Sequence, residues 1–208
     1  MTEPVIRLAR EDDRAEAYRV CLLTGNHGGD GEPLYRDDPD ALARIFVGPY
    51  LAFEPELSLL LEDDEGVCGY ALAALDSRRF YERYEGEWRP RLCATFAAPT
   101  GDPARWTPSQ RVYHTYHQPD YFCPEPYEQY PSHAHIDLLP RAQRRGHGRR
   151  MMQQILGMLG ERGSAGVHLG VSELNQRART FYAHLGFHEL AHAGSGEDAC
   201  IYMGMRLR

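Results

Sequence analysis

The stretch LLPRAQRRGHGRRMM, residues 138–152, decides how the rest of the sequence is interpreted. Five of the ten residues 141–150 are arginines, and they surround Gly146 and Gly148 just ahead of an apolar run. Glycines let a ligand come close to the backbone, arginines donate bidentate hydrogen bonds, and a helix that starts here presents free N–H groups at one point. The stretch therefore predicts a loop and helix start that bind a phosphate-bearing ligand.

A plainer interpretation of the same residues is a basic helix start that is exposed to solvent and binds nothing. The stretch contains neither the GxGxxG pattern of dinucleotide-binding proteins nor the GK[ST] ending of a P-loop. It is therefore not one of the familiar nucleotide-binding signatures, and both interpretations stay open on these residues alone.

The residues on either side give this loop its structural setting. Before it, SHAHIDLLP, residues 132–140, alternates in the manner of a β-strand. One face of that strand is expected in the core and holds Ala134, Ile136 and Leu138, and the other is polar and holds His133, His135 and Asp137. After the loop, apolar residues return at helical spacing, at Met151, Met152, Ile155, Leu156 and Leu159. The predicted order is strand, glycine loop, helix.

The remaining sequence predicts further strands and helices in alternation. Helices are expected over residues 11–25, over 40–53 with an end near Gly48 and Pro49, over 77–92, and from about Ala178 to Gly186. Strands are expected over residues 4–10 and 166–175, as a hairpin over 57–76, and as two closing strands over 186–207. We therefore expect a protein of the α/β class.

Length and composition suit one globular domain. The chain has 208 residues, of which 42% are hydrophobic and 25% charged. Residues 99–131 are rich in proline and tyrosine, which makes them too aromatic for a linker. We expect a single domain over residues 1–208 in which about 99–131 form an ordered insertion packed on the rest.

Charge and hydropathy exclude several classes of protein. The formal net charge is −7 and the isoelectric point near 5.8, which argues against general binding of nucleic acid. No run approaches 18 apolar residues and the first residues lack the pattern of a signal peptide, so a cytoplasmic protein without a membrane partner is expected. The five cysteines are scattered and are expected to be reduced thiols, and the sequence contains no lysine.

Two motifs resemble those of a known enzyme family. Gln143-Arg144-Arg145-Gly146-His147-Gly148 is similar to the Q/R-x-x-G-x-G/A signature of the GNAT N-acetyltransferases. Residues 175–187, NQRARTFYAHLGF, look like the second motif of that family, N-x-x-A-x-x-F-Y-x-x-x-G-F. The resemblance implies the GNAT fold, a mixed, splayed central sheet with helices on both faces. The aromatic insertion and residues 130–152 also resemble the branch similar to the acetyltransferase-like C-terminal domain of protein O-GlcNAc hydrolases.

The resemblance also implies where acetyl-CoA would bind. Backbone groups of Leu138 and Leu139 would hold the pantetheine arm and polarise the thioester carbonyl. Asn175 would contact the same arm, although it would serve equally well as the N-cap of the helix that follows. The loop residues implied to hold the pyrophosphate are Gln143, Arg144, Arg145, Gly146, His147, Gly148 and Arg149.

The chemistry implied is transfer of an acetyl group to an amine by direct attack. Tyr182 would protonate the departing thiolate, although the tyrosine of such a pair is often only a core residue. A base on the polar face of the 132–140 strand would take the amine proton, with Asp137 the first choice, His135 the second, and a water chain also open. The expected partner is a small-molecule or peptide amine of unknown identity.

Two alternatives compete with this enzyme. The resemblance to the hydrolase-associated domain leaves open a catalytically silent module that binds acyl-CoA or recognises a protein. The sequence also contains histidines and a cysteine that could form a zinc site, at His114, His117, Cys123, His133 and His135. We expect no metal, because an H-x-H pair on one strand face supplies no third ligand and the other candidates lie in an irregular stretch.

Overall fold

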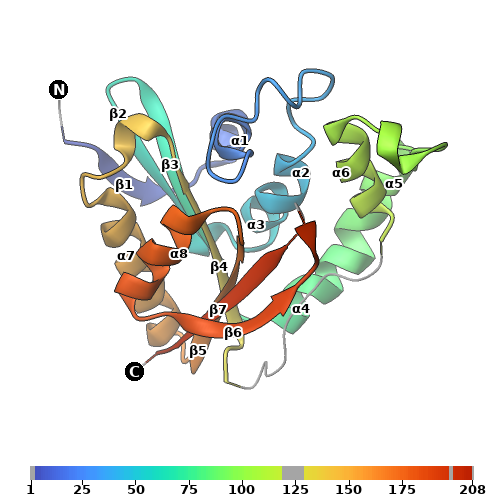
Figure 1. Cartoon of the computed structure of the whole chain (residues 1–208). Helices are drawn as coiled ribbons and strands as arrows, with labels where there is room; N and C mark the ends of the chain where they lie inside the picture. Colours follow the sequence, from blue (N-terminus) through green and yellow to red (C-terminus); the bar gives the residue numbers. More distant parts are fainter. Residues whose placement is uncertain (1–2, 119–128, 197–198, 208) are drawn as a thin grey trace.

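The fold is built from strands and helices that alternate along the chain, as Figure 1 shows. The computed structural model describes residues 3–118, 129–196 and 199–207. The strands are β1 (Val5–Leu8), β2 (Ser58–Asp63), β3 (Gly66–Ala74), β4 (Ser132–Leu138), β5 (Gly166–Ser172), β6 (His188–Ala193) and β7 (Cys200–Arg206). The helices are α1 (Arg14–Thr24), α2 (Ala43–Phe46), α3 (Gly48–Phe53), α4 (Ser77–Arg83), α5 (Arg89–Thr95), α6 (Pro108–Tyr116), α7 (His147–Glu161) and α8 (Gln176–Leu185).

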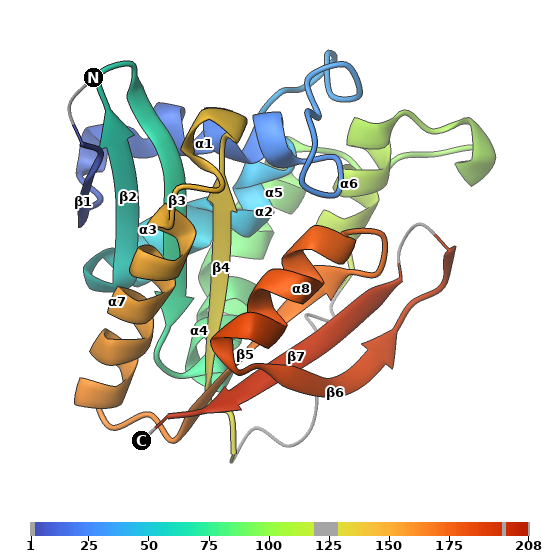
Figure 2. The same ribbon diagram turned by 60° about the vertical axis from the view of Figure 1, so that its left-hand side comes forward.

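The strands form one mixed sheet in the order β1-β2-β3-β4-β5-β7-β6. Neighbouring strands are antiparallel except β4 and β5, which run parallel and pair at Ser132 with Val167 and at His133 with His168. Beyond these two pairs the strands diverge, and Figure 2 shows the gap between their ribbons. The expected mixed, splayed central sheet is confirmed.

Helices cover both faces of this sheet, with α7 and α8 on one face and α1 and α3 on the other (Figures 1 and 2). The apolar side of α7 is buried at Met151, Met152, Ile155 and Leu159, as its helical spacing predicts. The core therefore lies on both sides of the central strands β2, β3 and β4.

The polar face of β4 is buried at His133. His133 is only 4% exposed, and its ring stacks on Tyr81 and packs edge-on against Tyr50 and Phe80. Its Nδ1 lies 2.8 Å from the hydroxyl of Ser77. The predicted polar face is therefore covered by α3 and α4 at this residue.

Most predicted helices and strands are confirmed, and the clearest difference lies at Gly48 and Pro49. The expected helix end is instead the start of α3, after α2 has ended at Phe46. Proline suits the first turn of a helix, where its missing N–H costs nothing. Gly48 is required because a Cβ there would lie 2.5 Å from the Tyr18 hydroxyl and 2.6 Å from the Trp88 ring.

The described part of the aromatic stretch 99–131 packs on the helices beside it. Helix α6 begins with a capping box at Thr107 and Gln110 and buries Val112 and Tyr116. Tyr116 donates from its hydroxyl to the Ala41 carbonyl at 2.6 Å, within a small second cluster of apolar residues. Cys123, Tyr121 and Tyr127 lie outside the described residues, so the single domain with one insertion stays a prediction.

Candidate active site

The divergence of β4 and β5 leaves one backbone donor aimed into the gap between them. The amide of Leu139 donates to the carbonyl of Cys68 at 2.8 Å, so this is a hydrogen-bonded pair of the β3–β4 ladder. Bonded and non-bonded pairs alternate along such a ladder, and Leu138, opposite Gly69, therefore turns its N–H and C=O away from β3. The Leu138 carbonyl accepts from Nε2 of Gln143 at 2.6 Å. The Leu138 N–H is thus directed into the gap.

A cavity of about 430 Å³ opens at this gap, between the end of β4, the start of α7 and one side of α8. Nine residues predicted from the sequence line it: Asp137, Leu138, Gln143, Arg144, Gly146, Gly148, Arg149, Asn175 and Tyr182. Leu139, Arg145 and His147 are not part of the lining. Further lining residues, which were not predicted as site residues, include Thr24, Gly28, Arg177 and Phe181.

The glycine loop has the geometry of an anion site. Gly146 caps α7 with φ of +82°, and Arg144 is also in the left-handed region at +59°. The first hydrogen bond of the helix runs from Arg150 N–H to the Gly146 carbonyl, so the three preceding N–H groups lie at an end without helical acceptors. A Cβ at Gly148 would lie 2.9 Å from the Leu138 side chain. The backbone is therefore open to an anion only because residue 148 has no side chain.

The five arginines of the loop divide into two groups. Arg141 pairs with Asp63 at 2.8 Å and Arg150 with Glu3 at 2.6 Å. The other three, at positions 144, 145 and 149, are exposed and make no ion pair with any residue that the structure describes. Guanidinium groups without an internal carboxylate partner are available to an anionic ligand.

Two predicted site residues, Leu139 and His147, are buried outside the cavity lining. Both backbone groups of Leu139 are paired, because its carbonyl accepts from Ala142 N–H at 2.9 Å while its own N–H binds Cys68. His147 is 6% exposed, and its Nδ1 has no hydrogen-bond partner among the described residues. Of the two neighbouring leucines, Leu138 is therefore the one that faces the gap.

The start of α8 is tied to a loop more than a hundred residues earlier. Asn175 accepts from Ala178 N–H at 3.0 Å, so the N-cap role considered from the sequence is confirmed. Arg177 donates to Gln143 at 2.6 Å and to the Gly28 carbonyl at 3.3 Å. These contacts hold the loop around Gly28, the glycine loop and α8 together around the cavity. No local sequence motif marks Gly28 for this position.

The candidate acid Tyr182 and the candidate base Asp137 both line this cavity. Tyr182 is 5% exposed, and burial, with the nearby charge of Asp137, raises the pKa of its hydroxyl well above the usual value. Asp137 accepts from the Tyr70 hydroxyl at 2.6 Å, and Nε2 of His135 lies 3.2 Å from the same carboxylate oxygen. Sequence reasoning missed Tyr70, which lies in an apolar run of β3 that gives it no signal except burial.

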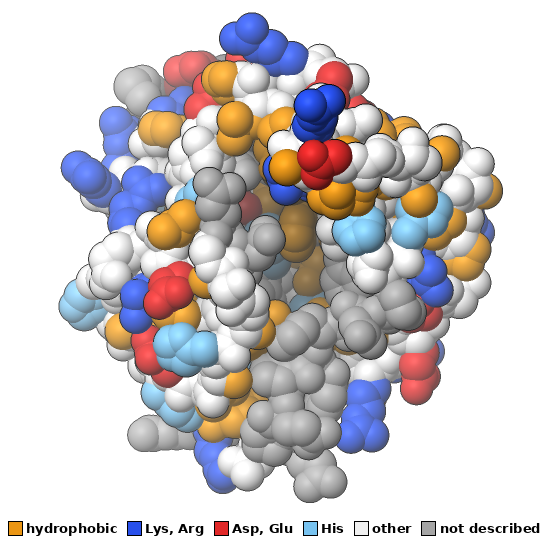
Figure 3. Space-filling model, turned by 45° about the vertical axis from the view of Figure 1, so that its right-hand side comes forward, with side chains coloured by type: hydrophobic (Ala, Val, Ile, Leu, Met, Phe, Trp, Pro, Cys, Tyr) orange, Lys and Arg blue, Asp and Glu red, His pale blue; other side chains and the backbone are white. Residues whose placement is uncertain are grey.

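A second cavity, of about 330 Å³, lies beside residues 133–135 of β4, whereas residues 136–138 line the first cavity. Its lining includes the aromatic residues Tyr50, Phe80 and Tyr81 and the histidines His133 and His135. Figure 3 shows one face of the molecule hollowed at its centre, with hydrophobic side chains on the floor of the hollow. His135 lines the second cavity and Asp137 the first, and these two side chains are neighbours on the same face of β4.

The zinc alternative has no support among the described residues. Within residues 3–118, 129–196 and 199–207, no three histidine, cysteine or acidic side chains are arranged to hold a metal ion. His117 instead lies 2.9 Å from the carbonyl of Phe96, and Cys123 is outside these ranges. In the same part of the chain, no helix combines the length and apolar composition needed to cross a membrane.

Solved structures resemble this fold to different degrees. The crystal structure of SsHAT covers all of both chains with a TM-score of 0.88 and 37% sequence identity. A GNAT superfamily phosphinothricin acetyltransferase from Sinorhizobium meliloti, solved in complex with acetyl-CoA, has a TM-score of 0.56 over 99% of this chain and 89% of its own. Its sequence identity is 15%, so this likeness concerns the fold alone.

Sequence comparison gives the family. The chain is 27% identical over 196 residues to protein O-GlcNAcase from Rattus norvegicus. These residues make up 94% of this chain and 21% of the relative. The chain thus spans about a fifth of the length of that curated relative, and the same figures hold for the protein from Mus musculus. A profile of the Acetyltransferase (GNAT) family matches residues 27–187. This range includes β4, which lines both cavities, and the whole glycine loop. The chain therefore belongs to the GNAT family of acetyltransferases.

Proposed function

We propose that this protein transfers the acetyl group of acetyl-CoA to an amine by direct attack on the thioester. The observation that carries the proposal is one cavity that runs from the N-terminus of α7 to Asp137 and Tyr182. Phosphate-binding groups at one end and proton-handling groups at the other are the arrangement that this reaction requires. The acceptor is a small molecule or a peptide amine.

The residues present fit acetyl-CoA. The free N–H groups at the start of α7, with Arg144 and Arg149 beside them, would hold the pyrophosphate. The Leu138 N–H is directed into the gap, where it would donate to the thioester carbonyl and stabilise negative charge on that oxygen. Asn175 uses its carbonyl oxygen as a helix cap, which leaves its amide nitrogen to contact the pantetheine arm.

Two protons must move when the C–N bond forms and the C–S bond breaks. Asp137 is the proposed base for the amine proton, with His135 beside it as the alternative. Tyr182 is the proposed acid for the thiolate, and burial supports this role because its raised pKa keeps the hydroxyl protonated.

Binding is tested by calorimetry with acetyl-CoA and the variant Gly148→Glu. The new side chain would lie against Leu138 and place a negative charge where the pyrophosphate is expected, so binding should be lost. The matched control is Gly157→Glu, on the same helix at a position where a Cβ has no neighbour within 4 Å. Binding by both variants at the parental affinity would show that the loop is not the phosphate site.

Turnover separates the enzyme from a silent acyl-CoA-binding or protein-recognition module. The assay measures CoA released with a panel of amines: spermidine, glucosamine, 2-phenylethylamine and a short peptide with a free N-terminus. Since the chain contains no lysine, acetylation of its own lysine side chains cannot add to the signal. Tight acetyl-CoA binding without CoA release above background for any class of amine would favour the silent module.

A further inference from the structure

Three side chains join the two cavities through hydrogen bonds on β3 and β4. Tyr70 lies directly opposite Asp137 in the antiparallel register, and its hydroxyl is 2.6 Å from Asp137 Oδ2. The same hydroxyl lies 3.1 Å from Nε2 of His135, and that nitrogen is 3.2 Å from Asp137 Oδ2. Each member of the cluster therefore contacts the other two.

The cluster lies in the wall between the two cavities. Asp137 lines the cavity that contains the glycine loop, whereas His135 lines the aromatic cavity. Tyr70 is fully buried and reaches neither cavity. A molecule in the aromatic cavity would thus meet the imidazole before the carboxylate.

The hydrogen bonds fix which nitrogen of His135 carries a proton. Burial, together with the charge of Asp137, raises the pKa of Tyr70 well above its usual value, so its hydroxyl stays protonated. The single hydroxyl proton goes to the Asp137 carboxylate, which can only accept. The Tyr70 oxygen is then also an acceptor for His135, and Nε2 must be the donor. In the neutral ring, the lone pair is on Nδ1.

No hydrogen bond joins this Nδ1 to another residue in the described part of the chain, and the side chain of His135 is 28% exposed. The imidazole therefore has the features of a base that is oriented by one partner and open to a substrate on the other side. Tyr70 and Asp137 occupy the orienting positions.

We propose that His135 accepts the proton of an amine that enters from the aromatic cavity, with Tyr70 and Asp137 as its positioning residues. As the amine nitrogen bonds to the acetyl carbon, its proton moves to Nδ1, and Nε2–H stays hydrogen-bonded to the cluster. The Asp137 carboxylate balances the charge of the imidazolium. This role rests on the proposed function. Within it, His135 replaces Asp137 as the base, and Asp137 becomes a residue that positions His135.

Other groups packed around the cluster do not replace His135. Cys21 of α1 and Tyr182 of α8 face it, and burial raises the pKa of both, so both are neutral. The Phe46 ring of α2 lies 6.0 Å from the imidazole and carries no charge. On β4, burial lowers the pKa of His133 far below its usual value, and its Nδ1 is already paired with Ser77.

The first test is nitrogen NMR of the His135 imidazole in the full chain, assigned with the variant His135→Gln. The expected spectrum has a protonated, pyrrole-like Nε2 and an unprotonated, pyridine-like Nδ1 above neutral pH. In Tyr70→Phe this preference should weaken, because one of the two acceptors of Nε2–H is gone. A parent spectrum in which Nδ1 carries the proton would overturn the proposal.

The second test is the pH dependence of turnover with the best amine of the panel. A histidine base predicts that the rate begins to fall with acid at a higher pH than a carboxylate base would give. His135→Gln should lower turnover by roughly 100-fold or more, and Tyr70→Phe by about 10-fold, with the Kd of acetyl-CoA unchanged in both. Parental turnover in His135→Gln would overturn this role for His135 and return Asp137 to it.

Failure of this inference and failure of the proposed function have different signatures. If the parent binds acetyl-CoA and acetylates an amine while the His135 and Tyr70 variants match it, only the division of roles is wrong. If the parent gives no turnover with any amine, the proposed function itself fails, and the role of His135 fails with it whatever the tautomer.

Discussion

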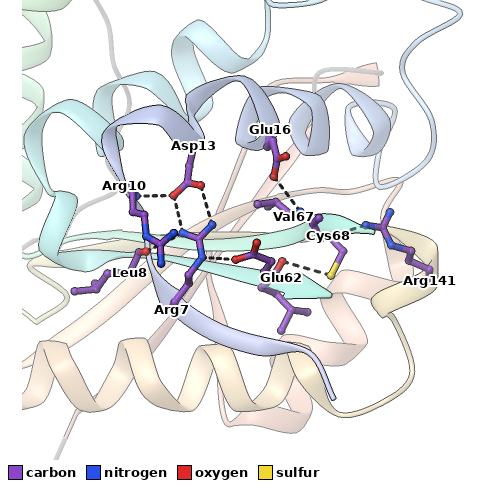
Figure 4. A network of polar contacts seen from close by, with 11 residues as sticks. Arg7, Leu8, Arg10, Asp13, Glu16, Glu62, Val67, Cys68 and Arg141 are labelled. Atoms are coloured by element: carbon purple, nitrogen blue, oxygen red, sulfur yellow. Dashed lines mark hydrogen bonds and ion pairs between the residues drawn. The ribbon is translucent and has the colours of Figure 1, made fainter. Parts of the chain in front are cut away.

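Arginines have opposite surroundings at two places in this molecule. Figure 4 shows the first, where Arg7 of β1 binds Asp13 with two hydrogen bonds of 2.6 and 2.8 Å and also pairs with Glu62. Asp13 accepts in addition from the backbone of Arg10 at 2.6 Å and is 8% exposed. At the second place, the start of α7, Arg144 and Arg149 are exposed and have no carboxylate partner among the described residues.

The difference shows which charges stabilise the fold and which are left for a ligand. A buried carboxylate is stable only when its hydrogen bonds are satisfied, so the Asp13 cluster holds β1, β2 and the start of α1 in place. Exposed arginines at a helix N-terminus repel each other and the positive end of the helix dipole until an anion binds. The first cluster should therefore respond to mutation in stability and the second in affinity.

The largest expected effect is on turnover, at the cavity beside the start of α7. Tyr182→Phe removes one hydroxyl and keeps the ring that packs against Phe181 and Phe187. Turnover should fall by roughly 10- to 1000-fold, while the Kd of acetyl-CoA and the melting temperature stay near those of the parent. The measurement is kcat with a saturating amine, and parental kcat in a folded variant would remove Tyr182 from the reaction.

The next largest effect is on stability, at the Arg7–Asp13 cluster. Asp13→Asn leaves the Arg7 guanidinium without its buried partner and should cost about 3 kcal/mol, which lowers Tm by roughly 6 to 12 °C. Acetyl-CoA affinity, measured well below Tm, should not change. The control is Glu3→Gln, whose partner Arg150 and own side chain are exposed, and it should cost no more than about 0.5 kcal/mol.

The Asp13 effect should also depend on pH in one direction. The hydrogen bond from Arg7 lowers the pKa of Asp13 below its ordinary value of 3.8. A carboxyl group whose pKa is lowered by folding stabilises the protein above its unfolded pKa and loses that contribution as pH falls through the folded value. In urea melts, the difference in free energy of unfolding between the parent and Asp13→Asn should therefore become smaller below about pH 4. A difference that becomes larger below this pH would contradict the stabilising role of the Asp13 carboxylate.

The smallest effect tests the unpaired arginines directly. Replacing Arg144 and Arg149 together by glutamine should weaken acetyl-CoA binding roughly 10-fold and flatten its dependence on salt, because two exposed charge contacts are lost. Stability should stay within about 0.5 kcal/mol of the parent. Arg150→Gln is the matched control, since Arg150 already pairs with Glu3 and does not line the cavity. An equal loss of affinity per charge removed in both variants would point to net charge instead of a site.

Sequence reasoning found the parts of the site that are continuous along the chain. The alternation of β4, the glycines at 146 and 148 and the helical spacing of α7 are local signals, and each led to the correct element. Tyr182 followed from the second motif and Asp137 from the polar face of the strand before the glycine loop, and both line the same cavity. These signals work because strand, turn and helix each leave a period or a required residue in a short stretch.

The parts that were missed depend on pairing between distant segments. Tyr70 reads as one more apolar residue of β3, and only the β3–β4 register brings its hydroxyl opposite Asp137. Gly28 reads as a loop glycine until Arg177 binds its carbonyl. The burial of His133 was also missed, because alternation cannot tell which face of a strand meets helices. Strand register and helix coverage are set by the whole core, and they are not written in any single motif.

A crystal structure of the chain with acetyl-CoA tests the central claim most directly. The account predicts the pyrophosphate within hydrogen-bonding distance of the backbone N–H groups at the start of α7, between Arg144 and Arg149. It also predicts the thioester carbonyl at the N–H of Leu138, with sulfur on the side of Tyr182. Density for acetyl-CoA at any other part of the surface, with the glycine loop binding no phosphate, would contradict it.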